Sequence, residues 1–410
     1  MRLLVATTGS DGDVRPFIAL ALALVARGHD VLFSAPDYYA SRVASYGLSF
    51  RKFGPPWSPA DMEAVFARVL AAKTPLAQLS TVMDAVAEPE RAAMPELLEM
   101  VSGVDAVIYP PILVAAAAAA RAKNVPHVSV QLAPVHRARG YGPTGDDMGT
   151  FLNGIMWSLA AFTLRRATDA KLNTIVAAAG LPPWRDVLFS AASSSLLDLV
   201  AVSPHVLARD PAWPPASRVT GYWFLDEPDF VVDPALASFV EDARPIVIGF
   251  GSMIGFDKEA TTRLVFDAVR DLDAKVVVQA GWAGLGAGDV PKNVHIAQFV
   301  PHAWLFPRAS AVVHHGGAGT TAAAIRAGVP QAIVWHLGDQ PVWGKRAKAL
   351  GLSPGFVSHK KLSARWLRDA IDRMRGEPAF AAAASALGEQ VRAEDGISVA
   401  VQAIEQTLAR

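Results

Sequence analysis

The sequence predicts an α/β fold with two domains, each built around a parallel sheet. Short apolar runs alternate with helical patterns along the chain, as where residues 2–7 precede the helical stretch 17–27 and the apolar run 30–34. Strand, helix and strand at this spacing indicate parallel strands joined by right-handed crossovers. The chain has 410 residues, which is too long for one ordinary domain.

The composition excludes several classes of protein. Hydrophobic residues make up 52% of the chain and charged residues 19%, which is typical of a packed globular protein. Because 38 basic residues balance 38 acidic ones, nucleic acid is not an expected partner. The sequence has no cysteine, which excludes disulfides and cysteine metal sites. The start MRLLVATTGS lacks the shape of a secretory signal, and no apolar run is long enough to span a bilayer, so we expect a cytoplasmic protein.

The first domain is expected over residues 1–215. Gly28 and Gly47 stand where two of its helices would end. The stretch 61–102 is expected to be largely helical, with interruptions at Pro75, Pro89 and Pro95. The stretch 134–149 is rich in Gly, Arg and Pro and predicts a long loop. The expected strands are 2–7, 30–34, 48–50, 105–109, 127–131 and, as the last of this half, 196–202; the expected helices include 17–27, 38–46 and 150–180.

A proline-rich segment separates this half from a second α/β series. We assign residues 216–234 to a linker and 235–390 to the second domain. Residues 391–410 are predicted to form a C-terminal helix that packs back on the first domain. Strands are expected at 244–250, 275–279, 294–296, 310–313 and 331–334, and helices at 258–272, 339–350, 362–375 and in the tail from 378, with a break at 395–396. Ligands of such sheets bind at the carboxyl ends of the strands, so the cleft between the two domains is the expected site.

The second half contains a strand, a glycine turn and a helix start in direct succession. Residues 312–330 read VVHHGGAGTTAAAIRAGVP. Gly316, Gly317 and Gly319 predict a tight turn with exposed backbone N–H groups, and a helix follows from Thr320. Free N–H groups and the helix dipole make such a turn a binding site for an anion, which we interpret as a nucleotide diphosphate.

Two common nucleotide-binding patterns fit poorly. A dinucleotide-binding oxidoreductase would have G-x-G-x-x-G after the first strand and an acidic residue after the second; here the loop is GSDGD and the second strand ends in Ser34-Ala35. The phosphate-loop string G-x-x-x-x-G-K-[ST] does not occur. An enzyme that uses a nucleotide sugar is the remaining interpretation.

A resemblance supports that interpretation. HHGGAGTTAAAIRAGVPQAIVWHLGDQ, residues 314–340, resembles the donor-binding signature of glycosyltransferases with two facing Rossmann-like domains, the GT-B fold. With the preceding FVPHAWLFPRASAVV, it most resembles the sterol 3-beta-glucosyltransferase branch and its bacterial antibiotic-glycosyltransferase relatives. TTGSDGDVRPFIALALALVARGHDV resembles the N-terminal motif of the family, usually GSRGDVxP, and VIGFGSM and residues 154–183 agree with it. The resemblance implies transfer with inversion and without a metal or other cofactor.

Asp13 is the candidate catalytic base. It follows the first strand and matches the acidic position proposed as base in this branch, where a carboxylate takes the proton of the acceptor hydroxyl. The alternative is that Asp13, or Asp11, caps the following helix. Asp11 stands where the family pattern usually has arginine, so a charge contact from that arginine is in doubt.

The donor site is assigned to both glycine turns and to two loops of the second domain. His315 would add a hydrogen bond to the diphosphate, and a charge if protonated, whereas His314 is expected to face the sheet interior. Asp339 and Gln340 would divide the sugar hydroxyls between them, or else only cap a helix. Phe299 would stack on the uracil and the Val300 backbone would read its edge. The full donor set is Ser10, Gly12, Ser252, Phe299, Val300, His302, His315, Gly317, Gly319, Thr320, Asp339 and Gln340, with no metal ligands.

The acceptor site is expected in the irregular parts of the first domain. Apolar and aromatic residues there suit a large lipophilic alcohol, although each of them could be ordinary core. The candidates are Trp57, Phe66, Pro134, Tyr141, Met148, Phe151 and Trp157.

The resulting prediction is a glycosyltransferase that moves glucose from UDP-glucose to a sterol or steroid. A polyketide, macrolide or glycopeptide acceptor with a UDP- or dTDP-sugar is the alternative within the class. Two alternatives belong to other classes of protein: a nucleotide-sugar epimerase, and a non-catalytic partner protein that binds a sugar nucleotide. A lipid acceptor leaves peripheral membrane contact open, and the oligomeric state is not predicted.

Overall fold

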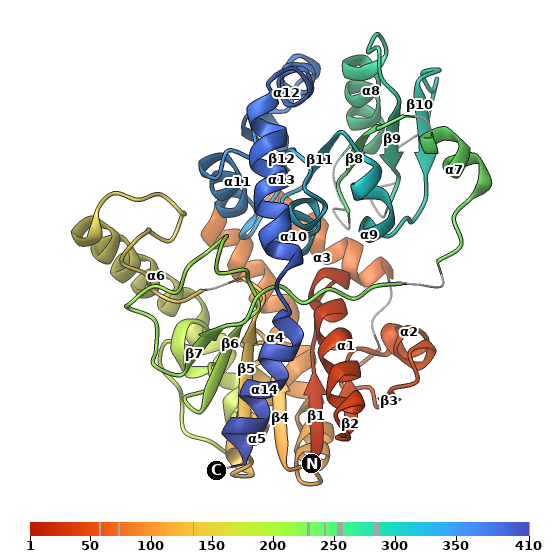
Figure 1. Cartoon of the computed structure of the whole chain (residues 1–410). Coiled ribbons are helices and arrows are strands. Elements are labelled where there is room, and N and C mark those ends of the chain that lie inside the picture. The colour runs from red at the N-terminus through yellow and green to blue at the C-terminus, as the bar shows by residue number, and fades with distance from the viewer. Residues whose placement is uncertain are drawn as a thin grey trace. The chain divides into compact units, whose positions relative to one another are not determined.

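The computed structural model describes residues 1–409 except 57–58, 73, 134, 228–229, 242, 252–256 and 282–287, and only the backbone of 59–60, 62–63, 66, 75 and 190. The chain forms two compact units (Figure 1). Unit 1 comprises Met1–Leu225 and Glu394–Arg410, and unit 2 comprises Asp226–Ala393. Each unit has its own parallel sheet, so the predicted α/β class is confirmed. That the two units face each other across a cleft stays a prediction.

The sheet of unit 1 has the strand order β3-β2-β1-β4-β5-β6-β7, and every described pairing in it is parallel. The chain runs outward from β1 through β2 to β3 and then returns to place β4 on the other side of β1. The strands are β1 (Arg2–Ala6), β2 (Asp30–Ser34), β3 (Ser49–Phe50), β4 (Ala106–Tyr109), β5 (His127–Gln131), β6 (Leu197–Val200) and β7 (Ser217–Val219).

Helices cover both faces of this sheet. On one face, α1 (Asp11–Ala26) and α14 (Gly396–Leu408) share a buried apolar cluster with the strands. On the other face, α4 (Pro75–Val101), α5 (Val114–Ala122) and α6 (Thr150–Ala178) form a second cluster. The alanines 115–120 of α5 are fully buried, because small side chains let this helix lie close to its neighbours. The remaining helices of unit 1 are α2 (Ala40–Ser45) and α3 (Pro59–Ala71).

The sheet of unit 2 has the order β10-β9-β8-β11-β12-β13, again with parallel pairings throughout the described residues. Its strands are β8 (Ile246–Gly249), β9 (Val276–Gln279), β10 (Val294–Ala297), β11 (Ala311–His314), β12 (Gln331–Trp335) and β13 (Phe356–Ser358). The helices are α7 (Pro234–Glu241), α8 (Lys258–Val269), α9 (His302–Leu305), α10 (Ala318–Ala327), α11 (Gln340–Ala349), α12 (Ala364–Gly376) and α13 (Pro378–Arg392).

Several elements differ from the prediction. The first helix begins at Asp11 rather than after Pro16, because Ser10 caps it. Pro89 and Pro95 lie inside α4 and do not interrupt it. Each proline removes one helical hydrogen bond, but the burial of apolar side chains such as Met83, Met94 and Leu97 holds the helix together.

The boundary between the units also differs in detail. Residues 217–219, which we assigned to the linker, form β7 at the edge of the first sheet, where Ser217 pairs with Asp198. A strand of three residues in a proline-rich segment gives no periodic signal, and edge strands tolerate such neighbours. Unit 2 begins at Asp226, inside the range 216–234, and α14 lies in unit 1 whereas residues 391–393 lie in unit 2.

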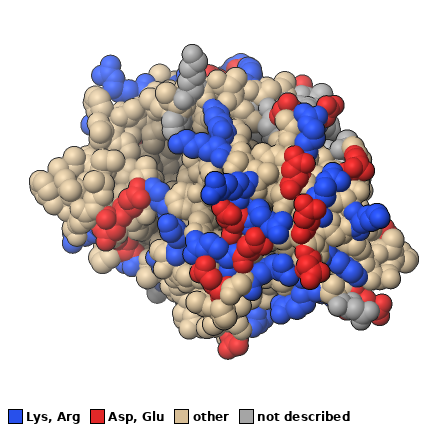
Figure 2. Space-filling view, turned by 90° about the horizontal axis from the view of Figure 1, so that it is seen from above, with Lys and Arg blue, Asp and Glu red and all other residues tan. Residues whose placement is uncertain are grey.

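Charged side chains of both signs are mixed on the face of the molecule in Figure 2. Some of the charged side chains pair along one helix: in α12, Arg368 pairs with Asp372 and Arg373 with Glu377, four residues apart. Within the described part of the chain, no helix is both long and apolar enough to cross a membrane.

Candidate active site

Both sheets have a point where the strand order reverses. In unit 1 this point lies between β1 and β4, and in unit 2 between β8 and β11. Open α/β sheets bind ligands beside the carboxyl ends of the strands at such a reversal. The loop that leads into the first turn of α1, where Asp13 lies, follows β1, and the turn with His315 follows β11. The two motifs singled out in the sequence therefore lie at these two points.

Asp13 lies in the first turn of α1 and is held by Ser10. The Ser10 backbone N–H donates to Asp13 Oδ2 at 2.8 Å, and the Ser10 hydroxyl donates to the same oxygen at 3.0 Å. Ser10 is therefore the N-cap of α1, and the alternative that Asp13 or Asp11 is the N-cap is wrong. Asp13 still completes a capping box, so its carboxylate has a fixed orientation at the carboxyl edge of the sheet.

Three residues that the sequence reasoning missed support this loop. Gly9 has a φ of 112°, and a Cβ atom there would lie 2.5 Å from Asp13 Oδ2, so only glycine leaves room for the carboxylate. The hydroxyl of Tyr38 donates to the Gly9 carbonyl at 2.9 Å and that of Tyr39 at 3.3 Å. Burial raises the pKa of Tyr38 to about 12, which keeps it a donor. For the two tyrosines, the only signal in the sequence was their position after β2, the strand beside β1.

Asp11 stands where the family pattern has arginine, and it forms an ion pair with Arg42 at 2.5 Å. Arg42 comes from α2, the helix that follows β2. A guanidinium group therefore lies beside this loop although the loop itself carries a carboxylate.

The two histidines of the second turn have different surroundings. His314 is 1% exposed; its Nε2 donates to Gln331 Oε1 at 2.8 Å and its Nδ1 accepts from the Gly316 N–H at 3.0 Å. Burial lowers its pKa to about 4, so it is a neutral structural residue that faces the sheet interior, as predicted. His315 is also buried, but among the described residues its Nδ1 has no hydrogen-bond partner.

The His315 ring lies between two glycines. A Cβ atom at Gly251, after β8, would lie 2.9 Å from His315 Cε1, and one at Gly317, the N-cap of α10, would lie 2.5 Å from Nε2. Burial, together with His314, His336 and His302, holds the pKa of His315 well below its usual value. The ring is therefore neutral near pH 7, and the suggestion that it carries a charge is not supported.

The start of α10 has the expected form of an anion site. Gly317 is its N-cap, and the Thr321 N–H donates the first helical hydrogen bond, to the Gly317 carbonyl at 2.9 Å. The N–H groups of the three residues before it are those that a helix leaves unbonded at its first turn. Gly319 is exposed and Thr320 is half-buried. A Cβ atom at Gly319 would meet no described atom within 4 Å, so this side of the turn is open.

Asp339 and Gln340 mainly organise the loop between β12 and α11. Asp339 Oδ2 accepts from the Trp343 indole N–H at 2.6 Å, and Gln340 Oε1 accepts from the N–H groups of His336 at 2.7 Å and Leu337 at 3.1 Å. Gln340 is buried, whereas Asp339 is exposed at the N-cap of α11. Trp343 was missed by the sequence reasoning, although it follows Asp339 by one helical turn.

The segment predicted to read the nucleobase lies at the same edge of the sheet. Phe299 is 55% exposed, whereas Val300 is buried and its carbonyl accepts from Gln279 Nε2 at 2.9 Å. The His302 ring stacks on Phe306, with 4.3 Å between ring centroids. Of these side chains, Phe299 therefore offers the most accessible aromatic surface.

The candidate acceptor residues divide into two groups. Trp157 is buried, donates its indole N–H to the Tyr141 carbonyl at 2.7 Å, and packs edge-on against Tyr141 and Phe189. Met148 and Phe151 are exposed instead. Trp157 therefore packs in the interior beside the loop 134–149, whereas Met148 and Phe151 are accessible; that these residues bind the acceptor stays a prediction. Trp57, Pro134 and Ser252, and the side chain of Phe66, lie outside the described residues.

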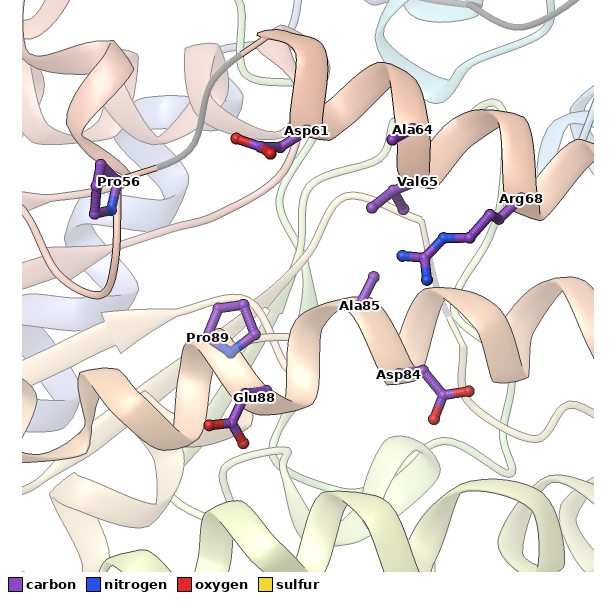
Figure 3. Close-up of a pocket in the computed structure, with 9 residues that line it drawn as sticks. All are labelled: Pro56, Asp61, Ala64, Val65, Arg68, Asp84, Ala85, Glu88 and Pro89. Carbon is purple, nitrogen blue, oxygen red and sulfur yellow. The ribbon is translucent and has the colours of Figure 1, made fainter.

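A groove of about 410 Å³ lies between α3 and α4 in unit 1 (Figure 3). Its walls carry the apolar residues Val65 and Ala85 and the charged residues Asp61, Arg68 and Glu88. Asp84 on the same wall pairs with Lys171 at 2.6 Å.

In the part of the chain that the structure describes, no cluster of three or more His, Cys, Asp or Glu side chains is suited to a metal ion.

Comparisons with known proteins agree with this arrangement. Residues 3–127 match the model of the glycosyltransferase family 28 N-terminal domain, and residues 263–406 match that of the erythromycin biosynthesis protein CIII-like C-terminal domain. The chain is 30% identical to O-mycaminosyltylonolide 6-deoxyallosyltransferase of Streptomyces fradiae, over 99% of this chain and 97% of that protein. It is also 30% identical to sterol 3-beta-glucosyltransferase of Yarrowia lipolytica, over 98% of this chain but only 28% of that protein.

A solved structure shows the same fold. The glycosyltransferase VinC in complex with DTDP matches with a TM-score of 0.71 at 22% identity, over all of both chains. Two Rossmann-like sheets with motifs at their reversal points define the GT-B class of proteins. The chain belongs to the GT-B glycosyltransferases, a family that includes both the sterol glucosyltransferases and the bacterial antibiotic glycosyltransferases.

Proposed function

We propose that this protein transfers a hexosyl group from a nucleoside diphosphate sugar to a hydroxyl group of a lipophilic acceptor, with inversion and without a metal. The observation that carries the proposal is the pair of sites at the two strand reversals. One supplies an oriented carboxylate, Asp13, and the other supplies a helix N-terminus beside a buried neutral histidine, His315. A base and an anion site are the two groups that such a transfer requires.

In the proposed reaction, the acceptor oxygen attacks the anomeric carbon in a single displacement. Asp13 takes the hydroxyl proton as the new C–O bond forms, and the bond from the anomeric carbon to the diphosphate oxygen breaks with its electron pair. Negative charge then grows on the diphosphate. The N–H groups at the start of α10 and the single ring N–H of neutral His315 stabilise it there, in surroundings where burial strengthens hydrogen bonds.

The first choice of substrates is UDP-glucose and a sterol or steroid. The identity with the sterol 3-beta-glucosyltransferase of Yarrowia lipolytica supports this choice. The chain spans 28% of the length of that relative. No cofactor besides the donor is proposed.

The second choice is a dTDP- or UDP-sugar and a polyketide or macrolide acceptor. A specific observation favours it: the deoxyallosyltransferase of Streptomyces fradiae matches over 97% of its own length. The structural relative VinC was solved in complex with DTDP, which is also consistent with a thymidine nucleotide.

A donor and acceptor matrix tests the proposal. The protein is incubated with UDP-glucose or dTDP-glucose and a panel of sterols and macrolide aglycones, with and without a chelator. A glucoside that still forms with chelator supports the proposal. Isomerised donor without a glucoside would instead indicate an epimerase, and binding of UDP without any turnover would indicate a non-catalytic partner.

Asp13→Asn tests the catalytic base. We expect transfer to fall by at least about 100-fold, since a positioned base contributes 10²–10⁴-fold, while UDP affinity stays within about twofold. Asp395→Asn is the matched control, because Asp395 also bonds a backbone N–H at a helix start of unit 1. Full activity of the Asp13→Asn protein would refute the assignment.

A further inference from the structure

The first half of α6 carries an exposed apolar stripe. Six large apolar side chains, between 45% and 79% exposed, lie on it and just before it. In Figure 1 this half of α6 extends away from the sheet of its unit. The buried side chains of the same half, Asn153, Trp157 and Ala161, lie on the opposite side of the helix. The stripe consists of Met148, Phe151, Leu152, Ile155, Leu159 and Phe162.

The spacing of these residues makes the stripe continuous. Residues four or three apart on a helix lie above one another, so Phe151, Ile155, Leu159 and Phe162 form one row. Gly154 and Ser158 are exposed beside that row, and a Cβ atom at Gly154 would meet no described atom within 4 Å. A second helix could therefore approach the stripe closely.

The two ends of the stripe have opposite charges. Asp146 and Asp147 are exposed just before its first residue. Arg166 follows Phe162 by one turn, and its guanidinium lies over the Phe162 ring at 5.6 Å. A second copy of the helix in antiparallel orientation would place Phe151 opposite Phe162, Ile155 opposite Leu159, and the two aspartates opposite Arg166. The pattern is thus complementary to itself about a point near Met156.

The area of the stripe is sufficient for a pair of chains. Six such side chains, each about half exposed, present roughly 500 Å² per copy, near the largest apolar patch of an ordinary monomer. Two copies would bury about 1,000 Å² from the stripe alone, and the flanking residues would bring the total into the range of a specific interface. An isologous contact of this kind closes as a two-fold dimer.

The charges favour a second copy of the chain over a lipid surface. Helices that lie on membranes are rich in Lys and Arg beside their apolar face. Residues 146–170 contain two arginines and three aspartates, and no lysine. We propose that the protein forms a homodimer through antiparallel pairing of the α6 stripe. This inference does not rest on the proposed function, although it uses Met148 and Phe151, which the sequence placed among the candidate acceptor residues.

Sedimentation velocity over a concentration series of the full chain tests the dimer. We expect a dimer at micromolar concentration, and Leu159→Glu should raise the dissociation constant at least about tenfold. Leu196→Glu is the matched control, because Leu196 is an exposed apolar residue of unit 1 outside the stripe; it should leave the dimer intact. A wild-type chain that remains monomeric at these concentrations overturns the proposal.

Charge reversal tests the orientation. Asp146→Arg and Arg166→Asp should each weaken the dimer, because each homodimer would then contain only like-charged ends. An equimolar mixture of the two variants should restore it, since the mixed dimer has complementary charges at both ends. A mixture no tighter than either variant alone would contradict antiparallel pairing. A monomer that floats with phosphatidylserine vesicles, and loses this binding on Leu159→Glu, would assign the stripe to membranes instead.

Discussion

The position of the His315 ring depends on two residues that have no side chain. Gly251 and Gly317 lie on either side of the imidazole, and a methyl group on either would overlap it. Gly317 has a φ of −61°, which any residue can adopt. Its role is therefore steric, and an alanine there tests the ring position without straining the backbone.

Gly317→Ala should weaken UDP binding about tenfold, which corresponds to roughly 1.4 kcal/mol, because the added methyl displaces His315 from the turn. Isothermal titration measures this loss. Gly376→Ala is the matched control in unit 2, since a Cβ atom there meets no described atom within 4 Å. Equal affinity of the two variants would show that the ring position does not affect the nucleotide.

Glu90 is a buried acid that the proposed reaction does not use. It is 4% exposed in α4, and its Oε2 accepts from the Ala115 N–H at 2.8 Å at the start of α5. Among the described residues its Oε1 has no hydrogen-bond partner. Burial raises the pKa of Glu90 from 4.5 to about 8, because the charged form loses its hydration.

This shift predicts a pH-dependent stability. Below pH 4.5 the carboxyl group is protonated in both the folded and the unfolded chain, so its contribution to stability is complete there. As the pH rises to about 8, the unfolded chain releases the proton first, and the free energy of unfolding falls by a few kcal/mol. Glu90→Gln should remove this fall, and Glu88→Gln, an exposed neighbour, should not. Urea unfolding of the three proteins at pH 5 and pH 8 measures the difference.

At the scale of the element, the start of α1 combines a helix cap with the candidate base. Ser10→Ala removes the hydroxyl that bonds Asp13 and should cost about 1 kcal/mol of stability. Turnover should also fall, because the carboxylate loses one of its two donors. Ser363→Ala removes a comparable cap from α12, where the Ser363 hydroxyl accepts from the Trp366 N–H at 3.1 Å. It should lose similar stability and keep its turnover, as unfolding curves and initial rates would show.

Elements with a local signal could be predicted from the sequence. The glycine turns after β1 and β11 and most strands were found because apolar runs and glycines are contiguous in the chain. The short edge strands β7 and β13 have three residues each and no periodicity, and α4 continues through two prolines because tertiary packing outweighs local propensity.

The parts of the candidate site that involve distant residues could not be predicted in this way. Tyr38 reaches the Gly9 carbonyl across 29 positions; outside the site, Glu90 likewise reaches α5 across 25. Trp343 binds Asp339 within one turn, but an indole in a helix is usually core. These contacts depend on how the elements pack, and a single sequence does not reveal that.

At the scale of the whole molecule, the C-terminal helix completes unit 1. Val401 and Ile404 of α14 are buried in the same cluster as Phe17 and Leu20 of α1. Glu405 also pairs with Arg27 at 2.9 Å. The chain therefore passes between the units twice, once just before the residues of unit 2 and once just after them.

Ile404→Ala should destabilise unit 1 by about 2–5 kcal/mol, the usual cost of a large-to-small change in a core. Val399→Ala on the same helix should cost less than about 0.5 kcal/mol, since Val399 is 46% exposed. Native-state hydrogen exchange should show faster exchange in α1 and β1 of the Ile404→Ala protein, with β11 and β12 of unit 2 unchanged. Uniform loss of protection in both units would mean that they unfold together.

The return of α14 to unit 1 also sets an order for folding on the ribosome. Residues 1–225 emerge first, yet the helix that covers part of their apolar face emerges only after all of unit 2. At about 5–20 residues per second, synthesis of unit 2 takes roughly 8 to 34 seconds. During this delay the nascent unit 1 leaves apolar surface of α1 uncovered, so the unit that is made first is completed last and is the one that would depend on chaperones.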